Sequence, residues 1–276
     1  MEHETTCLYR IHPTAIVSPK SQIDPSVEIG PNVIIEPHTK IGQGTKIEAN
    51  AYIGKYTTLG ENNHIHMGAI IGHVPQDLSF KSETVSYVEI GNNNVIREYV
   101  TIHRGSKSES KTTLGNSNFI MCNSHLAHNV SIGNEVVIGN FTGFAGYVTV
   151  GDKAFISGGV KLHQFVSVGR LALLSFGGGF SQDIPPFVIA YDRNKMKGIN
   201  LVGLRRSGMA QDAIGEIKKV YSTLYLLNHT FKEAMEILHS FSFKTKEGLE
   251  LLSFISDAKR ATVKREKKRS FQKESC

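Results

Sequence analysis

The sequence predicts a left-handed parallel β-helix built from six-residue repeats, followed by a small C-terminal α-helical domain. Aliphatic residues, and in two places Phe, recur at every sixth position over residues 23–71, 90–102 and 114–180. An α-helix repeats every 3.6 residues and a strand every two, so neither keeps a strict period of six on one face. A triangular coil does, because each repeat forms one short strand and one turn, and three repeats complete a circuit of 18 residues.

A second set of inward-pointing positions is expected four residues after each member of the first. These positions hold mostly small or β-branched residues, such as Val27, Val33, Thr39, Thr45 and Ala51. Glycine or asparagine near each corner is expected to adopt the positive φ that a tight turn requires. Neighbouring coils lie about 4.8 Å apart and share backbone hydrogen bonds. Residues that differ by 18 in number therefore form columns along the coil.

The β-helix is expected over residues 11–190. The period breaks at residues 73–88 and 106–113, which predicts loops that leave the coil, and loops on a rigid scaffold often carry function. Residues 191–262 are expected to form the helical domain. Helical spacing begins at Ser207 or Gly208, and two further helices are indicated over 231–241 and 246–260. Residues 263–276 are basic and are expected to form a flexible, solvated tail.

The composition is that of an ordinary globular protein, with 40% hydrophobic and 20% charged residues among 276. No apolar stretch approaches the roughly 18 residues of a membrane span, and no secretory signal is expected. Three widely spaced cysteines predict a reducing, cytoplasmic compartment without disulfides. Residues 259–276 contain eight Lys/Arg and two Glu, which account for the whole formal charge of +6. The remainder is neutral, which argues against a nucleic-acid-binding face.

Five short motifs occur along the chain in the order IGHVPQDL, VTIHRG, NSHLAHN, LHQF and QDIPP. Together they resemble the UDP-N-acetylglucosamine O-acyltransferases that begin lipid A synthesis, over residues 11–240. The resemblance implies transfer of a 3-hydroxyacyl group from acyl carrier protein to the 3-position of UDP-N-acetylglucosamine or its 3-amino analogue. It also implies a homotrimer with active sites between protomers, without a cofactor or a metal ion.

This reaction needs a base, because a sugar hydroxyl is a poor nucleophile, and histidine suits that role near neutral pH. It also needs a hydrogen-bond donor for the oxyanion of the tetrahedral intermediate. The resemblance assigns the base to His128 and the oxyanion donor to the backbone N–H of Gly146. The repeat supports the pairing independently, because residues 128, 146 and 164 differ by 18 and are expected to stack in one column.

The resemblance also implies substrate-binding residues around the predicted base. Asp77 and Gln76, in the first predicted loop, correspond to residues that bind the sugar. His125 lies three residues before the base and corresponds to a substrate-binding position. His163 and Gln164, in LHQF, correspond to residues that contact the sugar nucleotide or the acyl chain.

Two further residues, Asn200 and Arg206, correspond to a segment that reaches the nucleotide. An arginine there could bind a diphosphate in bidentate fashion. His103, in VTIHRG, is a motif residue whose role the resemblance leaves open. Acyl carrier protein is acidic, so a basic surface near the groove is expected. The candidates are Arg193, Lys195, Lys197, Arg205 and Arg206.

The chain departs from the family pattern at several positions near the predicted site. Tyr147 stands where the family usually has His, Ser79 where it has Lys, and Ser207 where it often has a second Arg. The segment AYDRNKMK also replaces a family Gly-Asn segment. The base and the oxyanion donor are unchanged. The acyl chain length and the choice between a 3-hydroxyl and a 3-amino acceptor stay open.

Three other functions are compatible with six-residue repeats. The chain could be a metal enzyme, since zinc carbonic anhydrases share the coil and His125 and His128 could bind a metal with a third His. It could be a non-catalytic paralogue that binds a nucleotide sugar. It could also be an acyltransferase that uses acyl-CoA, such as acetyl-CoA, on another sugar.

Overall fold

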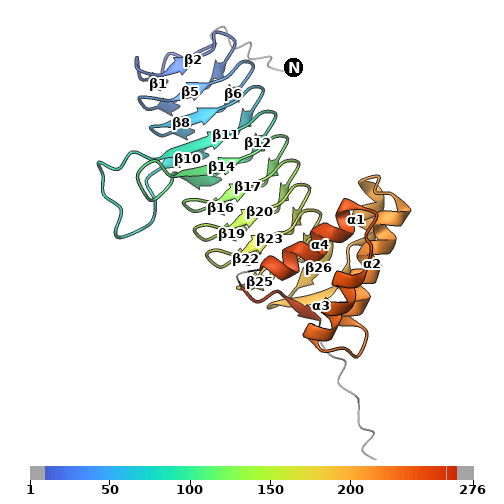
Figure 1. The fold of residues 1–276 in the computed structure, drawn as a ribbon. Helices are drawn as coiled ribbons and strands as arrows, with labels where there is room; N and C mark the ends of the chain where they lie inside the picture. Colours follow the sequence, from blue (N-terminus) through green and yellow to red (C-terminus); the bar gives the residue numbers. More distant parts are fainter. Residues whose placement is uncertain (1–9, 259, 266–276) are drawn as a thin grey trace, which may run out of the picture.

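The computed structural model describes residues 10–258 and 260–265. Its main body is a left-handed parallel β-helix, with a group of helices at its C-terminal end (Figure 1). Successive strands of the coil lie on successive sides of a triangular cross-section. Each strand therefore pairs with the strands three positions before and after it in the chain, and three sheets result. We call these sheets faces 1, 2 and 3.

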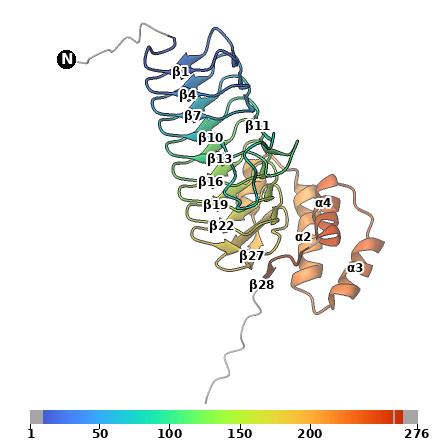
Figure 2. The same cartoon turned by 90° about the vertical axis from the view of Figure 1, so that its left-hand side faces the viewer.

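Figure 2 shows the strands of face 1 stacked along the coil. Face 1 consists of β1 (Ile16–Val17), β4 (Ile34–Ile35), β7 (Tyr52–Ile53), β10 (Ile70–His73), β13 (Thr101–His103), β16 (His125–Leu126), β19 (Gly143–Phe144), β22 (Lys161–Leu162) and β25 (Gly179–Phe180). Face 2 consists of β2 (Gln22–Ile23), β5 (Lys40–Ile41), β8 (Thr57–Leu59), β11 (Tyr87–Ile90), β14 (Lys111–Leu114), β17 (Ser131–Ile132), β20 (Thr149–Val150) and β23 (Ser167–Val168). Face 3 consists of β3 (Glu28–Ile29), β6 (Lys46–Ile47), β9 (His64–Ile65), β12 (Val95–Ile96), β15 (Phe119–Ile120), β18 (Val137–Ile138), β21 (Phe155–Ile156), β24 (Leu173–Leu174), β26 (Val188–Tyr191), β27 (Lys195–Ile199) and β28 (Lys264–Arg265).

The interior of the coil is one continuous apolar core, which confirms the predicted period. The inward residues at every sixth position are buried from Ile29 to Phe180, and Ile23 packs against them at the N-terminal end. The second inward set is confirmed too, since its predicted members are buried as well. They are Val27, Val33, Thr39, Thr45 and Ala51.

Positive φ occurs at the corners of the coil, three positions after the inward residues, and Gly or Asn holds many of these positions, as expected. Other residues adopt it there too; Tyr147, for example, has φ 63°. Some glycines serve a second purpose. Gly42 and Gly54, directly after inward residues, do not have positive φ. A Cβ on Gly42 would lie 2.7 Å from the Gly60 carbonyl carbon, and one on Gly54 2.4 Å from the Gly72 oxygen. These glycines are therefore required by the close approach of adjacent coils.

Three asparagine side chains form a buried ladder at inward positions of successive coils. Asn63, Asn94 and Asn118 are at most 1% exposed. Nδ2 of Asn94 donates to Oδ1 of Asn63 at 3.0 Å, and Nδ2 of Asn118 donates to Oδ1 of Asn94 at 2.9 Å. Each oxygen also accepts from a backbone N–H of the next coil. The ladder satisfies polar groups that would otherwise be unpaired in the core.

Both insertions leave the coil at the corner between faces 1 and 2. The first joins β10 to β11 and the second joins β13 to β14, so they lie on consecutive coils (Figure 1). Arg104 anchors the first insertion, because its guanidinium lies over the ring of Phe80 at 5.4 Å and near that of Tyr56 at 5.8 Å. The loops therefore share one corner and are held against the coil.

Beyond the coil, β26 and β27 form an antiparallel hairpin that extends face 3. Four helices follow and pack into a second apolar cluster. They are α1 (Leu201–Arg206), α2 (Gln211–Tyr225), α3 (Phe231–Ser240) and α4 (Lys246–Asp257). The prediction that a helix begins at Ser207 or Gly208 is wrong. Ser207 ends α1, a helix that periodicity did not indicate, and Gly208 has a φ of 76° that separates α1 from α2.

No helix in the described part of the chain combines the length and the apolar character that a membrane crossing requires. Most of the predicted basic tail, residues 266–276, lies outside the described residues. Residues 264 and 265 form β28, which pairs with β27 at the end of face 3.

Candidate active site

His128 lies at the corner between faces 1 and 2, on the coil that follows the second insertion. Its Nδ1 lies 3.0 Å from Oδ1 of Asn129. The same oxygen accepts from the backbone N–H of Ser106 at 3.0 Å. A backbone N–H can only donate, so the oxygen of the Asn129 amide faces His128 and the imidazole must donate through Nδ1–H. Nε2 then carries the lone pair, which is the form that a general base requires.

Tyr147 closes one side of the His128 ring. The two rings meet edge to face with centroids 5.3 Å apart, and Tyr147 stacks on Phe165 at 4.8 Å. The Tyr147 hydroxyl lies 3.3 Å from Oγ of Ser106, which also donates to Asn129. Tyr147, one of the departures from the family pattern, therefore contacts the second insertion and packs against the predicted base.

Gly146 lies one coil further along and in direct contact with the His128 ring, as its place in the column predicts. A Cβ at Gly146 would lie 2.5 Å from Cε1 and 2.8 Å from Nε2 of His128. Among the residues that the structure describes, none accepts a hydrogen bond from the Gly146 N–H. Stabilisation of an oxyanion requires a free donor of this kind close to the base.

Replacement of Gly146 with alanine is expected to lower kcat by about 100-fold, because the new methyl group must displace the imidazole, and a misplacement of about 1 Å costs that much. Global stability should change little, because the new methyl group meets the end of the His128 side chain rather than backbone. The measurement is steady-state kinetics together with thermal unfolding. Gly215→Ala on α2, where a Cβ meets no atom within 4 Å, is the control. Full kcat in Gly146→Ala would contradict the contact described here.

A row of histidines leads from the first insertion toward His128 along face 1. The His103 ring lies 6.2 Å from that of His73 and 5.1 Å from that of His125. Nδ1–H of His103 donates to the carbonyl of Val74, at the start of the first insertion. Burial lowers the pKa of His103, and it lowers the pKa of His125 to about 4. Both imidazoles are therefore neutral near pH 7, which suits hydrogen bonding to an uncharged sugar.

The low pKa of His125 predicts a pH-dependent loss of stability. The unfolded chain, with an ordinary histidine pKa of about 6.5, binds this proton more readily than the folded chain, so stability falls as the pH drops from about 6.5 to about 4. Between pH 7.5 and pH 5 the His125 contribution is expected to reach about 1–2 kcal/mol after solvent screening. Chemical unfolding of the native protein and of His125→Gln at both pH values isolates it. Equal losses in both proteins would show that His125 is not the source.

Asp77 lies in the first insertion, in a turn that its own side chain stabilises. Its Oδ1 accepts from the backbone N–H of Ser79 at 2.9 Å and from the Ser79 hydroxyl at 2.7 Å. These hydrogen bonds lower the pKa of Asp77, with a smaller contribution from the charge on His128. The loop thus brings Asp77 within electrostatic range of the base, and Ser79 shapes its turn. Gln76, next to Asp77, is exposed and free to reach a ligand.

His163 and Gln164 are exposed on the coil that follows Gly146. His163 lines an open groove of about 560 Å³, together with Lys161 of face 1 and Arg193 beyond the coil. Lys161 contributes to the low pKa of His125, so its charge lies near that histidine. Asp192 also lines the groove, so two cationic groups face one carboxylate, and we call it the cationic groove.

Asn200 and Arg206 do not join His128 within one chain. The Asn200 amide donates to the carbonyl of Leu171 at 2.9 Å and caps α1 by accepting from the Gly203 N–H at 3.1 Å. Leu171 lies at the corner between faces 2 and 3, whereas His128 lies between faces 1 and 2. Arg206, in the last turn of α1, is exposed. The structure thus explains Asn200 as a helix cap and leaves Arg206 available to a ligand.

The carbonic anhydrase alternative gains no support from the geometry. His125 forms a hydrogen bond with Thr101 through Nδ1, at 2.7 Å, and His128 forms its own with Asn129. In residues 10–258 and 260–265, the one group of three potential metal ligands contains neither histidine. The sequence reasoning missed Thr101, Ser106 and Asn129, which orient the two histidines. Asn129 could have been found, since it directly follows the base in NSHLAHN.

Comparisons with known proteins agree with this arrangement. The family model described as UDP N-acetylglucosamine O-acyltransferase, domain 2, matches residues 183–263. The model described as bacterial transferase hexapeptide matches residues 38–73 and 111–146. These matches cover the C-terminal region and two parts of the coil.

Curated relatives match over most of the chain. An acyl-[acyl-carrier-protein]–UDP-N-acetylglucosamine O-acyltransferase of Thermodesulfovibrio yellowstonii is 44% identical over 252 residues, which cover 91% of this chain and 97% of the relative. Solved structures agree. A UDP-N-acetylglucosamine acyltransferase of Bacteroides fragilis has a TM-score of 0.88 at 39% identity, covering 92% of this chain and all of that one. One from Francisella novicida has a TM-score of 0.88 at 34% identity, covering 94% and 95%.

Proposed function

Because the chain belongs to the UDP-N-acetylglucosamine O-acyltransferase family, we propose that it transfers a 3-hydroxyacyl group from acyl carrier protein to the 3-position of UDP-N-acetylglucosamine or its 3-amino analogue. The observation that carries the proposal is the pairing at the corner between faces 1 and 2. There the His128 ring, whose Nε2 carries the lone pair, lies against Gly146, whose N–H has no acceptor among the described residues.

The reaction proceeds by direct attack. The 3-hydroxyl, or the 3-amino group, loses a proton to Nε2 of His128 as it bonds to the thioester carbonyl carbon. The carbonyl oxygen becomes an oxyanion that accepts from the Gly146 N–H. The C–S bond then breaks, and the proton on His128 passes to the departing thiolate. Asn129 supports the charged imidazole by accepting from its Nδ1–H throughout.

The proposed assembly is a homotrimer in which coils pack side by side. Its support is that Arg206 lies in α1, whose cap Asn200 contacts Leu171 at the corner between faces 2 and 3, whereas His128 lies between faces 1 and 2. A second protomer that supplies Arg206 would let both residues serve one ligand. Acyl carrier protein is the proposed donor, and the exposed basic residues around the cationic groove suit an acidic partner. Lys195 is the least available of them, because it pairs with Asp192 at 3.0 Å. The wide spacing of the cysteines supports a reducing, cytoplasmic location.

The proposal is tested with the purified full-length protein. It is assayed with UDP-N-acetylglucosamine and with the 3-amino analogue, each against a panel of 3-hydroxyacyl carrier proteins of different chain length and against acyl-CoA. Turnover with at least one carrier-protein donor is expected. Turnover with acyl-CoA alone, or with no member of the panel, overturns the proposal. Light scattering should report a mass three times that of the chain.

A further inference from the structure

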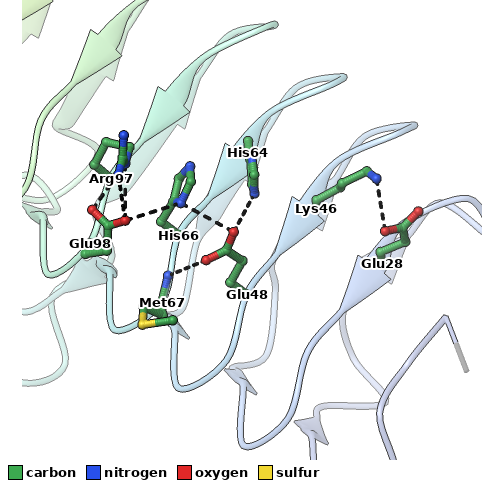
Figure 3. A network of polar contacts seen from close by, with 8 residues as sticks. All are labelled: Glu28, Lys46, Glu48, His64, His66, Met67, Arg97 and Glu98. Carbon is green, nitrogen blue, oxygen red and sulfur yellow. Dashed lines mark hydrogen bonds and ion pairs between the residues drawn. The ribbon is translucent and has the colours of Figure 1, made fainter. Parts of the chain in front are cut away.

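A second cluster of histidines lies away from the active site, at the corner between faces 3 and 1 near the N-terminal end of the coil (Figure 3). Nε2 of His64 lies 2.8 Å from Oε1 of Glu48, and Nδ1 of His66 lies 3.3 Å from the same oxygen. The two imidazoles stack with centroids 4.0 Å apart. Two nitrogens and one carboxylate oxygen therefore converge on one small volume.

We propose that Glu48, His64 and His66 bind one divalent transition-metal ion, for which Zn²⁺ is the best match. The three ligand atoms lie within 4.8 Å of one another. Neighbouring ligands of a tetrahedral zinc ion, at bond lengths of about 2.0–2.1 Å, are about 3.3 Å apart. The separation of 3.3 Å between His66 and Glu48 matches that spacing, and the hydrogen bond of 2.8 Å between His64 and Glu48 must lengthen when a metal ion replaces its proton. Imidazole with carboxylate is a donor set that zinc accepts readily, whereas magnesium and calcium prefer oxygen alone.

The surroundings favour a cation. Glu98 approaches the cluster from the next coil, with Oε1 3.6 Å from Nδ1 of His66, and Arg97 holds that carboxylate in place at 2.9 Å. Glu48 is oriented by the backbone N–H of Met67, which donates to Oε2 at 3.2 Å. Oriented ligands of this kind bind a metal more tightly, because less conformational freedom is lost on binding.

Neighbouring groups leave the position accessible, although Arg97 already compensates the charge of Glu98. Lys46 is directed away from the cluster, because it pairs with Glu28 at 3.2 Å (Figure 3). An open groove of about 610 Å³, lined in part by Glu48 and His64, gives water and ions a path to the ligands. A water molecule from this groove can complete a four-coordinate site.

The site is independent of the proposed acyl transfer, since it lies at another corner of the coil. Glu48 belongs to one coil, His64 and His66 to the next, and Glu98 to the one after. A bound ion would therefore join adjacent coils through their side chains, in addition to the backbone hydrogen bonds between them. Any ligand that binds only the folded state raises the midpoint of unfolding.

The test uses the full-length protein after treatment with EDTA and dialysis. Calorimetric titration with ZnSO4 is expected to show one ion bound per chain at micromolar concentration, and thermal unfolding should shift upward with added zinc. His64→Gln and His66→Gln are each expected to weaken binding by about 10-fold or more. Both variants should retain the acyl-transfer rate of the native protein, which separates this test from that of the proposed function.

Two matched controls keep the result specific. His239→Gln changes an exposed histidine on α3, and His128→Gln removes the proposed base of the active site. Both should bind zinc as the native protein does. Zinc binding that is unchanged in His64→Gln and His66→Gln, or that is lost in His128→Gln, overturns the proposal. So does the absence of stoichiometric binding at micromolar zinc.

Discussion

Replacement of His128 with alanine is expected to lower kcat by about 10²–10⁴-fold, the usual contribution of a positioned general base. The reason is the tautomer of the His128 ring, which leaves one nitrogen able to accept a proton. Asn129 accepts from Nδ1–H, so Nε2 holds the only lone pair of the ring, and the ring lies against Gly146. Removal of the ring leaves the oxyanion donor in place, but no group remains to take the proton of the acceptor hydroxyl. Steady-state kinetics with carrier-protein donor and UDP-sugar acceptor measure the loss.

Binding should be largely retained in this variant, because His128 contributes to the chemical step and other residues hold the sugar. Calorimetric titration with UDP-N-acetylglucosamine is therefore expected to give a Kd close to that of the native protein. His239→Ala, on the exposed surface of α3, serves as the control and should keep full kcat. If His128→Ala retains more than a tenth of native kcat, another group is the base and the proposed mechanism is wrong.

Replacement of Asn94 with valine is expected to destabilise the protein by about 3–5 kcal/mol, because each buried polar group left without a partner costs about 1–3 kcal/mol. The Asn94 oxygen accepts from both the backbone N–H and the side-chain amide of Asn118. Its own amide donates to Asn63 and to the carbonyl of Gly115. Valine has a similar shape but makes none of these bonds. Chemical unfolding monitored by circular dichroism gives the difference in free energy.

The chain provides a close control on its outer surface. Asn116 also forms stacked amide contacts, donating through Nδ2 to Asn134 at 2.9 Å and accepting from the Asn92 N–H at 2.8 Å, but it is exposed. Water can replace these bonds, so Asn116→Ala should cost about 1 kcal/mol or less. If Asn94→Val does not fold, Asn94→Thr gives a milder change, since Thr45 holds the same inward column. Equal effects at Asn94 and Asn116 would contradict the role of burial.

Much of the fold could be predicted because the coil repeats one local rule. Every inward residue from Ile29 to Phe180 follows from the period alone, and so does the contact between His128 and Gly146. Features that do not repeat were harder to predict from the sequence. α1 has six residues, which is too short for helical spacing to be recognised, and its Asn200 cap resembles any polar residue in a loop. The tautomer of His128 depends on Ser106, 22 residues away across an insertion whose path no period describes.

The insertions have a further consequence for how the coil closes its turns. Regular neighbours along face 1, such as Tyr52 and Ile70, are 18 residues apart, whereas Ile70 and Thr101, on either side of the first insertion, are 31 apart. The entropy of loop closure grows only with the logarithm of length, so the longer connection costs about 0.5 kcal/mol more. The length of the connection at this corner can therefore change during evolution at almost no cost in the free energy of folding. Substrate preference and the rigidity of the scaffold can change independently of each other.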